Sequence, residues 1–299
     1  MLRRTAWAGV AVLALVAGAL WQQLPGIGAG GLLHPARRPV TRPAPDGCVT
    51  SEFAGAGVTL RGWTCTPPST PRATIVYLHG VADNRESAAG VVRRFLPKGF
   101  GVVAYDSRAH GESDGSACTY GFFEKEDLHR VIDTLPAGPV VLIGTSLGAA
   151  VALQEAAGDP RVTTVIAAET FSDLRTVATE RAPRFFTRGT IARAFALAES
   201  DAHFRVDEVS PVAAASRITI PVLLIHGAAD VDTPPAHSQR VRAVLRGPSE
   251  LILVPGAHHN ESLNGAEIWP RIEAWIAPAT AAGTPAAGRR TSTTPSRSR

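Results

Sequence analysis

Short, continuous apolar runs dominate the middle of the sequence, and stretches with helical spacing separate them. A strand that is apolar on both faces is typical of the interior of a parallel sheet. Alternation of such strands with helices indicates an α/β protein. We therefore predict a mainly parallel central sheet with helices on both faces, preceded by a β-hairpin. The expected strands are 58–63, 74–78, 102–105, 140–143, 163–168, 222–226 and 251–254, and the clearest helices are 124–135 and 147–157.

By composition, the chain of 299 residues divides into a central body and two different ends. Residues 47–277 carry the expected strands and helices, and we predict a single domain there. Within it, residues 174–210 interrupt the rhythm of strands and predict a small helical cap. Residues 35–46, rich in proline and arginine, predict an extended linker. Residues 278–299 contain only Ala, Thr, Ser, Pro, Gly and Arg, which is typical of a disordered tail.

Residues 1–34 have the pattern of a targeting segment. Arg3 and Arg4 precede an uncharged run that is most apolar over residues 6–20. That run is long for the core of a signal peptide and short for a membrane span of about 20 residues. We expect either an uncleaved membrane anchor, with the two arginines on the cytoplasmic side, or a signal peptide. The body is then extracytoplasmic and membrane-anchored, or secreted; the alternative is a buried helix of a cytosolic protein.

Basic residues gather at the two ends of the chain. The whole sequence has a net charge of +4, but residues 47–277 contain 21 basic and 25 acidic residues, a net charge of −4. A nucleic-acid enzyme is expected to keep a basic stripe on its folded body. We therefore expect no nucleic-acid partner. The basic ends predict solvated, flexible tails, with contact to anionic lipid or cell wall as the alternative.

The three cysteines are Cys48, Cys65 and Cys118. The first two flank a predicted hairpin that turns at residues 55–57. An ungapped hairpin with that turn places Cys48 directly opposite Cys65, within the reach of a disulfide. Export would permit the bond. We predict a disulfide between Cys48 and Cys65, with Cys118 left over and without a catalytic role.

The segment V-V-L-I-G-T-S-L-G-A-A, residues 140–150, contains the pattern G-x-S-x-G around Ser146. It follows a predicted buried strand and opens a predicted helix rich in small residues. In that context the pattern indicates a nucleophilic serine on a tight strand-to-helix turn. Flanking glycines let the strand and the helix approach closely. The alternative is an ordinary glycine-rich turn.

An acid and a base are expected after Ser146, at the ends of later predicted strands. Asp230 follows one such strand, and His258 and His259 follow another. An imidazole with a pKa near neutrality suits proton transfer from a serine, and a carboxylate fixes its tautomer. Asp232 competes with Asp230 but lies in a predicted turn before two prolines. Spacing alone leaves both histidines as candidates for the base.

Two backbone N–H groups are predicted to form an oxyanion hole. Leu147 follows the serine at the start of a helix, where the dipole contributes positive partial charge. Val81 follows His79-Gly80 in the loop after an early predicted strand. Two donors aimed at one oxyanion lower the barrier to acyl transfer. We expect the ring of His79 to support this loop rather than to react.

Together these motifs resemble the α/β-hydrolase superfamily over residues 50–277. They are H-G at 79–80, G-x-S-x-G at 144–148, H-G-x-x-D at 226–230 and G-x-x-H-N at 256–260. The chain looks similar to exported or membrane-anchored serine hydrolases with a small cap, of the serine aminopeptidase-like and acyl-protein thioesterase-like branches. The segment 105–115 is similar to a scaffold loop of the family, in which Asp106, Arg108 and His110 would brace the backbone.

The resemblance implies an α/β-hydrolase fold and a Ser146, Asp230 and His259 triad. Matching G-A-H-H-N at 256–260 to the family's G-A-G-H-N places the base at His259, with His258 where glycine is usual. The implied activity is cleavage of an ester, a thioester or a peptide or amide bond through an acyl-enzyme. The implied partner is a small-molecule, acyl or peptide substrate.

No cofactor is implied, and the histidines lack the spacing of a zinc site. Two alternatives stay open: a catalytically silent, exported binding module on the same scaffold, and a cofactor-free perhydrolase or haloperoxidase.

Overall fold

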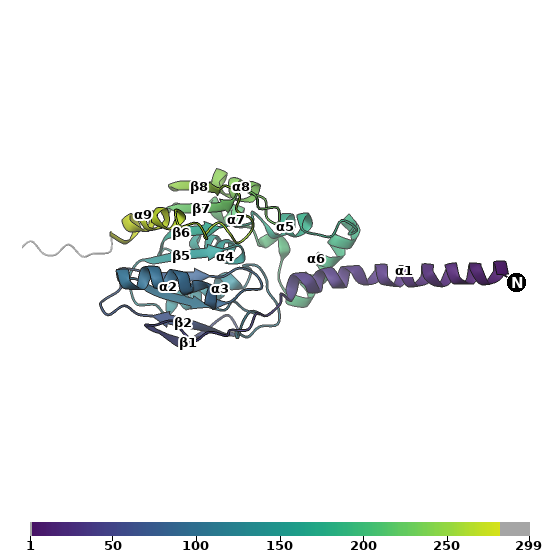
Figure 1. Ribbon diagram of the computed structural model, residues 1–299, viewed down its shortest axis with the longest axis horizontal. Helices are drawn as coiled ribbons and strands as arrows, with labels where there is room; N and C mark the ends of the chain where they lie inside the picture. The colour runs from purple at the N-terminus through teal and green to yellow at the C-terminus, as the bar shows by residue number, and fades with distance from the viewer. Residues whose placement is uncertain (1, 282–299) are drawn as a thin grey trace, which may run out of the picture.

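One sheet forms the centre of the molecule (Figure 1). The structure is a computed structural model that describes the backbone of residues 2–281 and the side chains of residues 18–278. Eight strands of this part of the chain lie in the order β1-β2-β4-β3-β5-β6-β7-β8. They are β1 (Cys48–Ala54), β2 (Thr59–Cys65), β3 (Thr74–Leu78), β4 (Gly101–Tyr105), β5 (Val140–Thr145), β6 (Val162–Ala168), β7 (Val222–Gly227) and β8 (Ser249–Val254).

The neighbouring strands β4, β3, β5, β6, β7 and β8 run parallel to one another. In contrast, β2 is antiparallel to both of its neighbours, β1 and β4. Every residue of β3, β4 and β7 is buried, as their continuous apolar sequences predict. The seven strands expected from sequence are confirmed with ends shifted by a few residues. The mainly parallel α/β fold with an N-terminal hairpin is therefore confirmed.

Helices cover both faces of the sheet. Apolar side chains of α3, α4, α7 and α8 pack in one core and those of α2 and α9 in another, each against alternate residues of the strands. On β3, for example, Val76 and Leu78 face the first core, while Ile75 and Tyr77 face the second. The helices are α2 (Ala89–Phe95), α3 (Glu124–Asp133), α4 (Leu147–Ala156), α7 (Pro211–Ala215), α8 (Ala236–Val244) and α9 (Ile268–Ala281).

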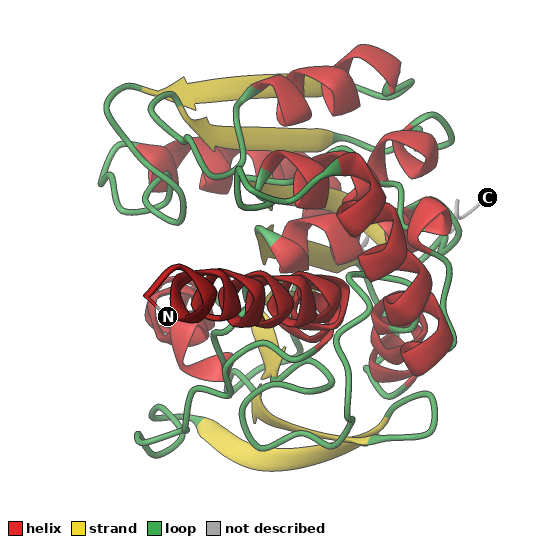
Figure 2. Cartoon of the chain, turned by 90° about the vertical axis from the view of Figure 1, so that its right-hand side faces the viewer, coloured by secondary structure: helices red, strands yellow, loops and turns green. Residues whose placement is uncertain are grey.

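Between β6 and β7 the chain leaves the sheet and forms α5 (Leu174–Glu180) and α6 (Arg188–Ala202). The long helix α1 (Leu2–Leu33) projects away from the body in Figure 1, and Figure 2 views it nearly end-on. Its last turns pack against α6. Ala29 and Leu33 are buried there in a third apolar core. The end of α1 is thus part of the folded body.

The predicted N-terminal targeting segment and C-terminal tail are only partly covered by the described residues. The apolar run over residues 6–20, on which the predicted anchor or signal peptide rests, lies mostly outside the residues with described side chains. Within the described residues, no helix has the length and apolar character needed to cross a membrane. The helix α9 ends a little beyond the predicted start of the tail at 278. The rest of that tail, residues 282–299, lies outside the described residues.

The predicted hairpin forms, with Cys48 paired to Cys65 across β1 and β2. The two sulfurs are joined, so the predicted disulfide is confirmed. Gly57 has a φ of +76° in the connecting turn, a backbone conformation that glycine adopts without strain. Cys118 is a free, buried thiol, and burial raises its pKa well above the ordinary value. Such a thiol is a poor nucleophile, as expected for a structural cysteine.

Replacing Cys48 and Cys65 together with alanine should lower the free energy of unfolding by about 3 kcal/mol. The bond spans a sequence separation of 17 residues, and it restricts the unfolded chain accordingly. Urea unfolding of the variant and of the oxidised and reduced wild type would measure the loss. Peptide mapping without reductant should yield one linked peptide, and two separately alkylated cysteines would contradict the bond.

Candidate active site

Ser146 occupies the sharp turn between β5 and α4, with φ 48° and ψ −110°. Few residues with a side chain adopt this backbone conformation, which stores strain. A Cβ at Gly144 would lie 2.4 Å from the backbone of Gly148, and one at Gly148 would lie 2.1 Å from the carbonyl oxygen of Leu78. Both glycines are therefore required sterically, because the strand and the helix meet at the serine.

The strain at Ser146 can be measured with two variants that both lack the hydroxyl. Glycine adopts a positive φ without a Cβ clash, so Ser146→Gly should exceed Ser146→Ala in free energy of unfolding by about 1 kcal/mol. Because neither variant bonds His259 through a hydroxyl, that loss cancels in the comparison. Chemical denaturation of the two variants gives the difference, and an alanine variant of equal or greater stability would show that the turn is unstrained.

The three side chains predicted as a triad come together. His259 Nδ1 lies 2.7 Å from Asp230 Oδ2, and His259 Nε2 lies 3.0 Å from Ser146 Oγ. The three residues follow β8, β7 and β5, whose carboxyl ends meet at one edge of the sheet. His258, by contrast, is exposed, and its backbone N–H donates to the carboxylate of Glu261. The geometry thus agrees with His259, and not His258, as the histidine of the site.

Asp230 is held by several donors. It accepts hydrogen bonds from the backbone N–H groups of Asp232, at 3.0 Å, and Thr233, at 2.8 Å. The buried ring of His226 places Nε2 3.2 Å from Asp230 Oδ2. Burial alone would raise the pKa of Asp230, but the hydrogen bonds from His226, His259 and Thr233 lower it well below its usual range. Asp230 therefore stays a carboxylate that accepts a hydrogen bond from the Nδ1–H of His259.

The loop after β3 lies against the serine. A methyl group at Gly80 would sit 3.6 Å from the Cβ of Ser146. Within the described part of the chain, neither the N–H of Val81 nor that of Leu147 donates to a protein acceptor. Two unpaired backbone donors thus flank Ser146, which is what the predicted oxyanion hole requires.

His79 supports this loop, as expected. Its Nε2 accepts from the N–H of Ser107 at 2.9 Å, and its Nδ1–H donates to the carbonyl of Gly80 at 2.7 Å. The ring therefore joins the loops that follow β3 and β4. The segment 105–115 braces the same region, because Asp106 accepts hydrogen bonds from Arg85 and Glu112.

The other two predicted bracing residues also bind within the scaffold. Arg108 forms a paired hydrogen bond to Asp127, with both distances 2.7 Å. His110 Nδ1 lies 2.9 Å from the carbonyl oxygen of Arg108, and its ring is fully buried against the ring of His79. None of these groups lines the pocket at Ser146. The scaffold role expected of Asp106, Arg108 and His110 is confirmed.

Acid should destabilise the protein through His110. Burial, together with the neighbouring ring of His79, lowers the pKa of His110 to about 4. Between that value and the ordinary pKa near 6.5, the unfolded chain binds a proton that the folded chain does not, so stability falls as the pH falls. We expect this group to account for a loss of about 3 kcal/mol between pH 7 and pH 4. Urea unfolding across this range should show a shallower pH dependence in His110→Gln, and equal slopes would contradict the assignment.

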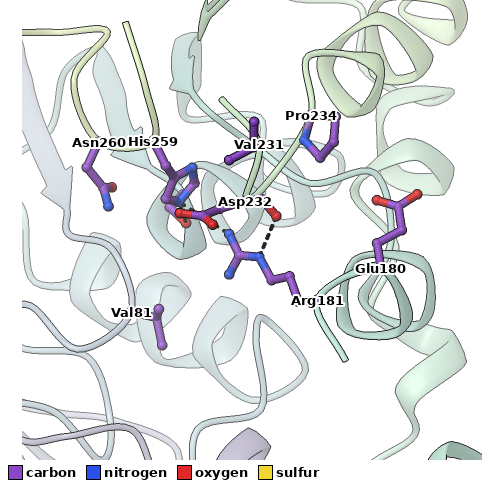
Figure 3. A pocket seen from close by; sticks show the side chains of 9 residues that line it. Val81, Glu180, Arg181, Val231, Asp232, Pro234, His259 and Asn260 are labelled. Carbon is purple, nitrogen blue, oxygen red and sulfur yellow. Dashed lines mark hydrogen bonds between the residues drawn. The ribbon is translucent and has the colours of Figure 1, made fainter. Parts of the chain in front are cut away.

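A pocket of about 530 Å³ opens in front of Ser146 and His259 (Figure 3). Arg181, the residue that follows α5, reaches into it; its Nε donates to the carbonyl oxygen of Asp232 at 2.8 Å and its Nη2 to the hydroxyl of Thr233. The neighbouring Glu180 also lines the pocket, and His237 Nε2 lies 2.8 Å from its carboxylate. The exposed Asp232 lies on the pocket wall and contacts Arg181 through its backbone carbonyl, and it is Asp230, not Asp232, that lies beside His259.

Sequence reasoning missed Arg181, Glu180 and His226. The first two lie in the stretch 174–210, where no motif marks individual residues. His226 did have a signal, because it precedes Asp230 by four residues in H-G-x-x-D, at the end of the same strand.

Away from Ser146, a cluster of three described residues has side chains of the kind that bind metal ions. Donor atoms of His129, Glu155 and Asp159 lie within 4.8 Å of one another. Arg161 already binds Asp159 through Nε at 2.9 Å and Nη2 at 2.6 Å. The cluster lies at the end of α4 opposite Ser146, so it is separate from the candidate active site.

Comparisons with known proteins agree with the fold. Residues 73–212 match the model of the alpha/beta hydrolase fold family. The uncharacterised protein YqkD of Bacillus subtilis is 30% identical over 213 residues, which cover 68% of this chain and 70% of YqkD. The uncharacterised protein YfhR of Escherichia coli K12 is 29% identical over 234 residues, covering 74% and 77% of the two chains.

Among solved structures, the esterase Pf2001 of Pyrococcus furiosus superimposes with a TM-score of 0.65 at 23% identity, covering 82% of this chain and 98% of the esterase. The sheet order, the strained serine turn and these matches lead to one conclusion. The chain belongs to the α/β-hydrolase superfamily.

Proposed function

We propose that the protein is a serine hydrolase that cleaves a carboxylic ester or thioester through an acyl-enzyme. The observation that carries the proposal is the hydrogen-bonded chain from Asp230 through His259 to Ser146, at 2.7 and 3.0 Å. Membership of a hydrolase superfamily and the likeness to an esterase support it. Amide bonds have poorer leaving groups, so we place esters and thioesters before peptides.

In the first half of the reaction, Ser146 Oγ attacks the carbonyl carbon of the ester. His259 Nε2, 3.0 Å away, accepts the hydroxyl proton as the new C–O bond forms. The carboxylate of Asp230 stabilises the resulting imidazolium and keeps Nδ1 protonated. The unpaired N–H groups of Val81 and Leu147 would then bind the oxyanion of the tetrahedral intermediate.

Collapse of the intermediate breaks the bond between the acyl carbon and the leaving group. His259 gives the proton from Ser146 to the departing alkoxide or thiolate, which leaves as an alcohol or thiol. In the second half, a water molecule attacks the acyl-serine while His259 accepts its proton. The products are a carboxylic acid and the restored Ser146 hydroxyl, so the cycle needs no external oxidant or reductant.

Labelling of the full-length protein with a fluorophosphonate tests the proposal directly, because this probe reacts with activated serines. We expect one adduct on Ser146 in the wild type, located by peptide mass mapping, and no adduct in Ser146→Ala. A folded wild type that takes no label would contradict the proposal and would instead favour a silent binding module. After labelling, turnover of p-nitrophenyl esters, acyl thioesters and aminoacyl p-nitroanilides separates the substrate classes.

A further inference from the structure

A second pocket of about 510 Å³ adjoins the one at Ser146. The last turns of α1 form one of its walls, and α5 and α6 form others. Val81 and Arg181 line both pockets. The predicted oxyanion loop and the arginine beside His259 thus lie where the two pockets adjoin, so the second pocket is next to the space in front of Ser146.

The lining of the second pocket is almost entirely apolar. Of its side chains only Tyr120 and Arg181 carry polar atoms. The hydroxyl of Tyr120 donates to the carbonyl of Leu32 at 3.1 Å, and the guanidinium of Arg181 bonds the loop after β7. The other lining side chains offer an occupant only apolar contact, which an alkyl chain matches and a charged or hydroxylated group does not.

The end of α1 is a fixed wall of this pocket. A Cβ at Gly28 would lie 3.0 Å from the ring of Phe186 and 3.1 Å from the Cβ of Ala194, so the small residue lets α1 approach α6 closely. The carbonyl of Leu33 accepts the N–H of Cys118 at 2.8 Å, which ties the helix end to the body. Ile27 lines the pocket and is 63% exposed, so the pocket opens to solvent at that end.

We propose that this second pocket binds the acyl chain of the substrate and that the last turns of α1 set the preferred chain length. The inference rests on the proposed esterase function, and it names the substrate class as esters of medium or long aliphatic acids. Each methylene group that the pocket buries contributes a roughly constant amount to the free energy of binding. We therefore expect kcat/KM to rise about fourfold for each CH₂ added to the acyl chain, until the pocket is full.

The test uses p-nitrophenyl acetate and p-nitrophenyl decanoate with the full-length chain. Gly31 lines the pocket, and a Cβ there meets no atom within 4 Å, so Gly31→Phe would fill the pocket without a backbone clash. We expect the ratio of kcat/KM for decanoate to that for acetate to fall at least about tenfold. Gly26→Phe is the matched control, because Gly26 lies in the same helix, also has free space at its Cβ and does not line the pocket. Its ratio should equal that of the wild type.

A second variant changes the wall that α5 forms. Ala178 lies on α5 and lines the same pocket. We expect Ala178→Phe to lower the ratio of kcat/KM for decanoate to that for acetate, as Gly31→Phe does. This variant tests the proposal if Gly31→Phe fails to fold. A wild type without preference for decanoate, or pocket-filling variants with an unchanged ratio, would overturn the acyl pocket while leaving the labelled Ser146 and the esterase proposal intact. Failure of Ser146 to take the fluorophosphonate would overturn both.

Discussion

Replacement of Ser146 with alanine is expected to lower kcat for ester hydrolysis by at least about 10⁴-fold. The variant removes the oxygen that lies 3.0 Å from His259 Nε2, so no nucleophile remains to attack the ester and no hydroxyl proton is left for the imidazole. Steady-state rates on the best p-nitrophenyl ester would measure the loss. Circular dichroism should show an unchanged fold, because alanine keeps the Cβ and makes no new contact.

A second serine of this chain supplies a matched control. Ser172 Oγ lies 2.9 Å from His237 Nδ1, and His237 Nε2 lies 2.8 Å from Glu180, so the three residues repeat the chemical types of a triad. Their arrangement differs, however, since the Ser172 hydroxyl donates to Asp173 and accepts from Arg240.

Ser172 is also completely buried and does not line the pocket at Ser146. Ser172→Ala should therefore cost less than about tenfold in kcat. Turnover that persists in Ser146→Ala, or that is lost equally in Ser172→Ala, would contradict the assignment of the nucleophile.

Much of the fold could be predicted because the central strands are buried on both faces. Their apolar character is then continuous along the chain, as in residues 222–225, and it stands out without any knowledge of the neighbouring strands. The disulfide was predictable for a similar reason, since the turn at 55–57 fixes the register that pairs Cys48 with Cys65. Both are local patterns whose consequences follow from strand geometry.

The candidate triad was predictable because each of its members lies at the end of a strand or in the short loop that follows it. In a parallel sheet the carboxyl ends lie along one edge, so residues separated by more than a hundred positions meet there. The choice between His258 and His259 was different. Spacing leaves both open, and only the resemblance of residues 256–260 to the family motif favours His259. In the structure the backbone of this turn directs His259 toward Ser146 and leaves His258 exposed.

The second pocket could not be predicted from the sequence. Its walls come from α1, α5 and α6, whose approach depends on contacts such as that of Gly28 with Ala194, between residues far apart in the chain. The glycines of residues 26–31 indicate no partner by themselves. The pattern of residues 1–34 favours a targeting element over a buried helix, whereas in the structure the final turns of this segment pack into the body beside the predicted active site.

His259→Ala should lower kcat/KM by at least about 10⁴-fold, whereas His258→Ala should leave it within about twofold of the wild type. Only the ring of His259 lies between Asp230 and Ser146, at 2.7 and 3.0 Å. His258 is exposed and is held through its backbone N–H, which alanine retains. Esterase rates of the two variants, with fluorophosphonate labelling of Ser146 in each, provide the measurement.

Two adjacent histidines make this comparison unusually selective. A general disturbance of the turn at 256–260 would lower the activity of both variants alike. The ratio of their rates therefore reports the contribution of the His259 imidazole and not that of the loop. Added imidazole should restore part of the activity of His259→Ala, since a small base can enter the vacated space beside the serine, and should leave His258→Ala unchanged. Equal losses in the two variants, without rescue, would show that the turn matters for structure alone and would remove His259 from the proposed mechanism.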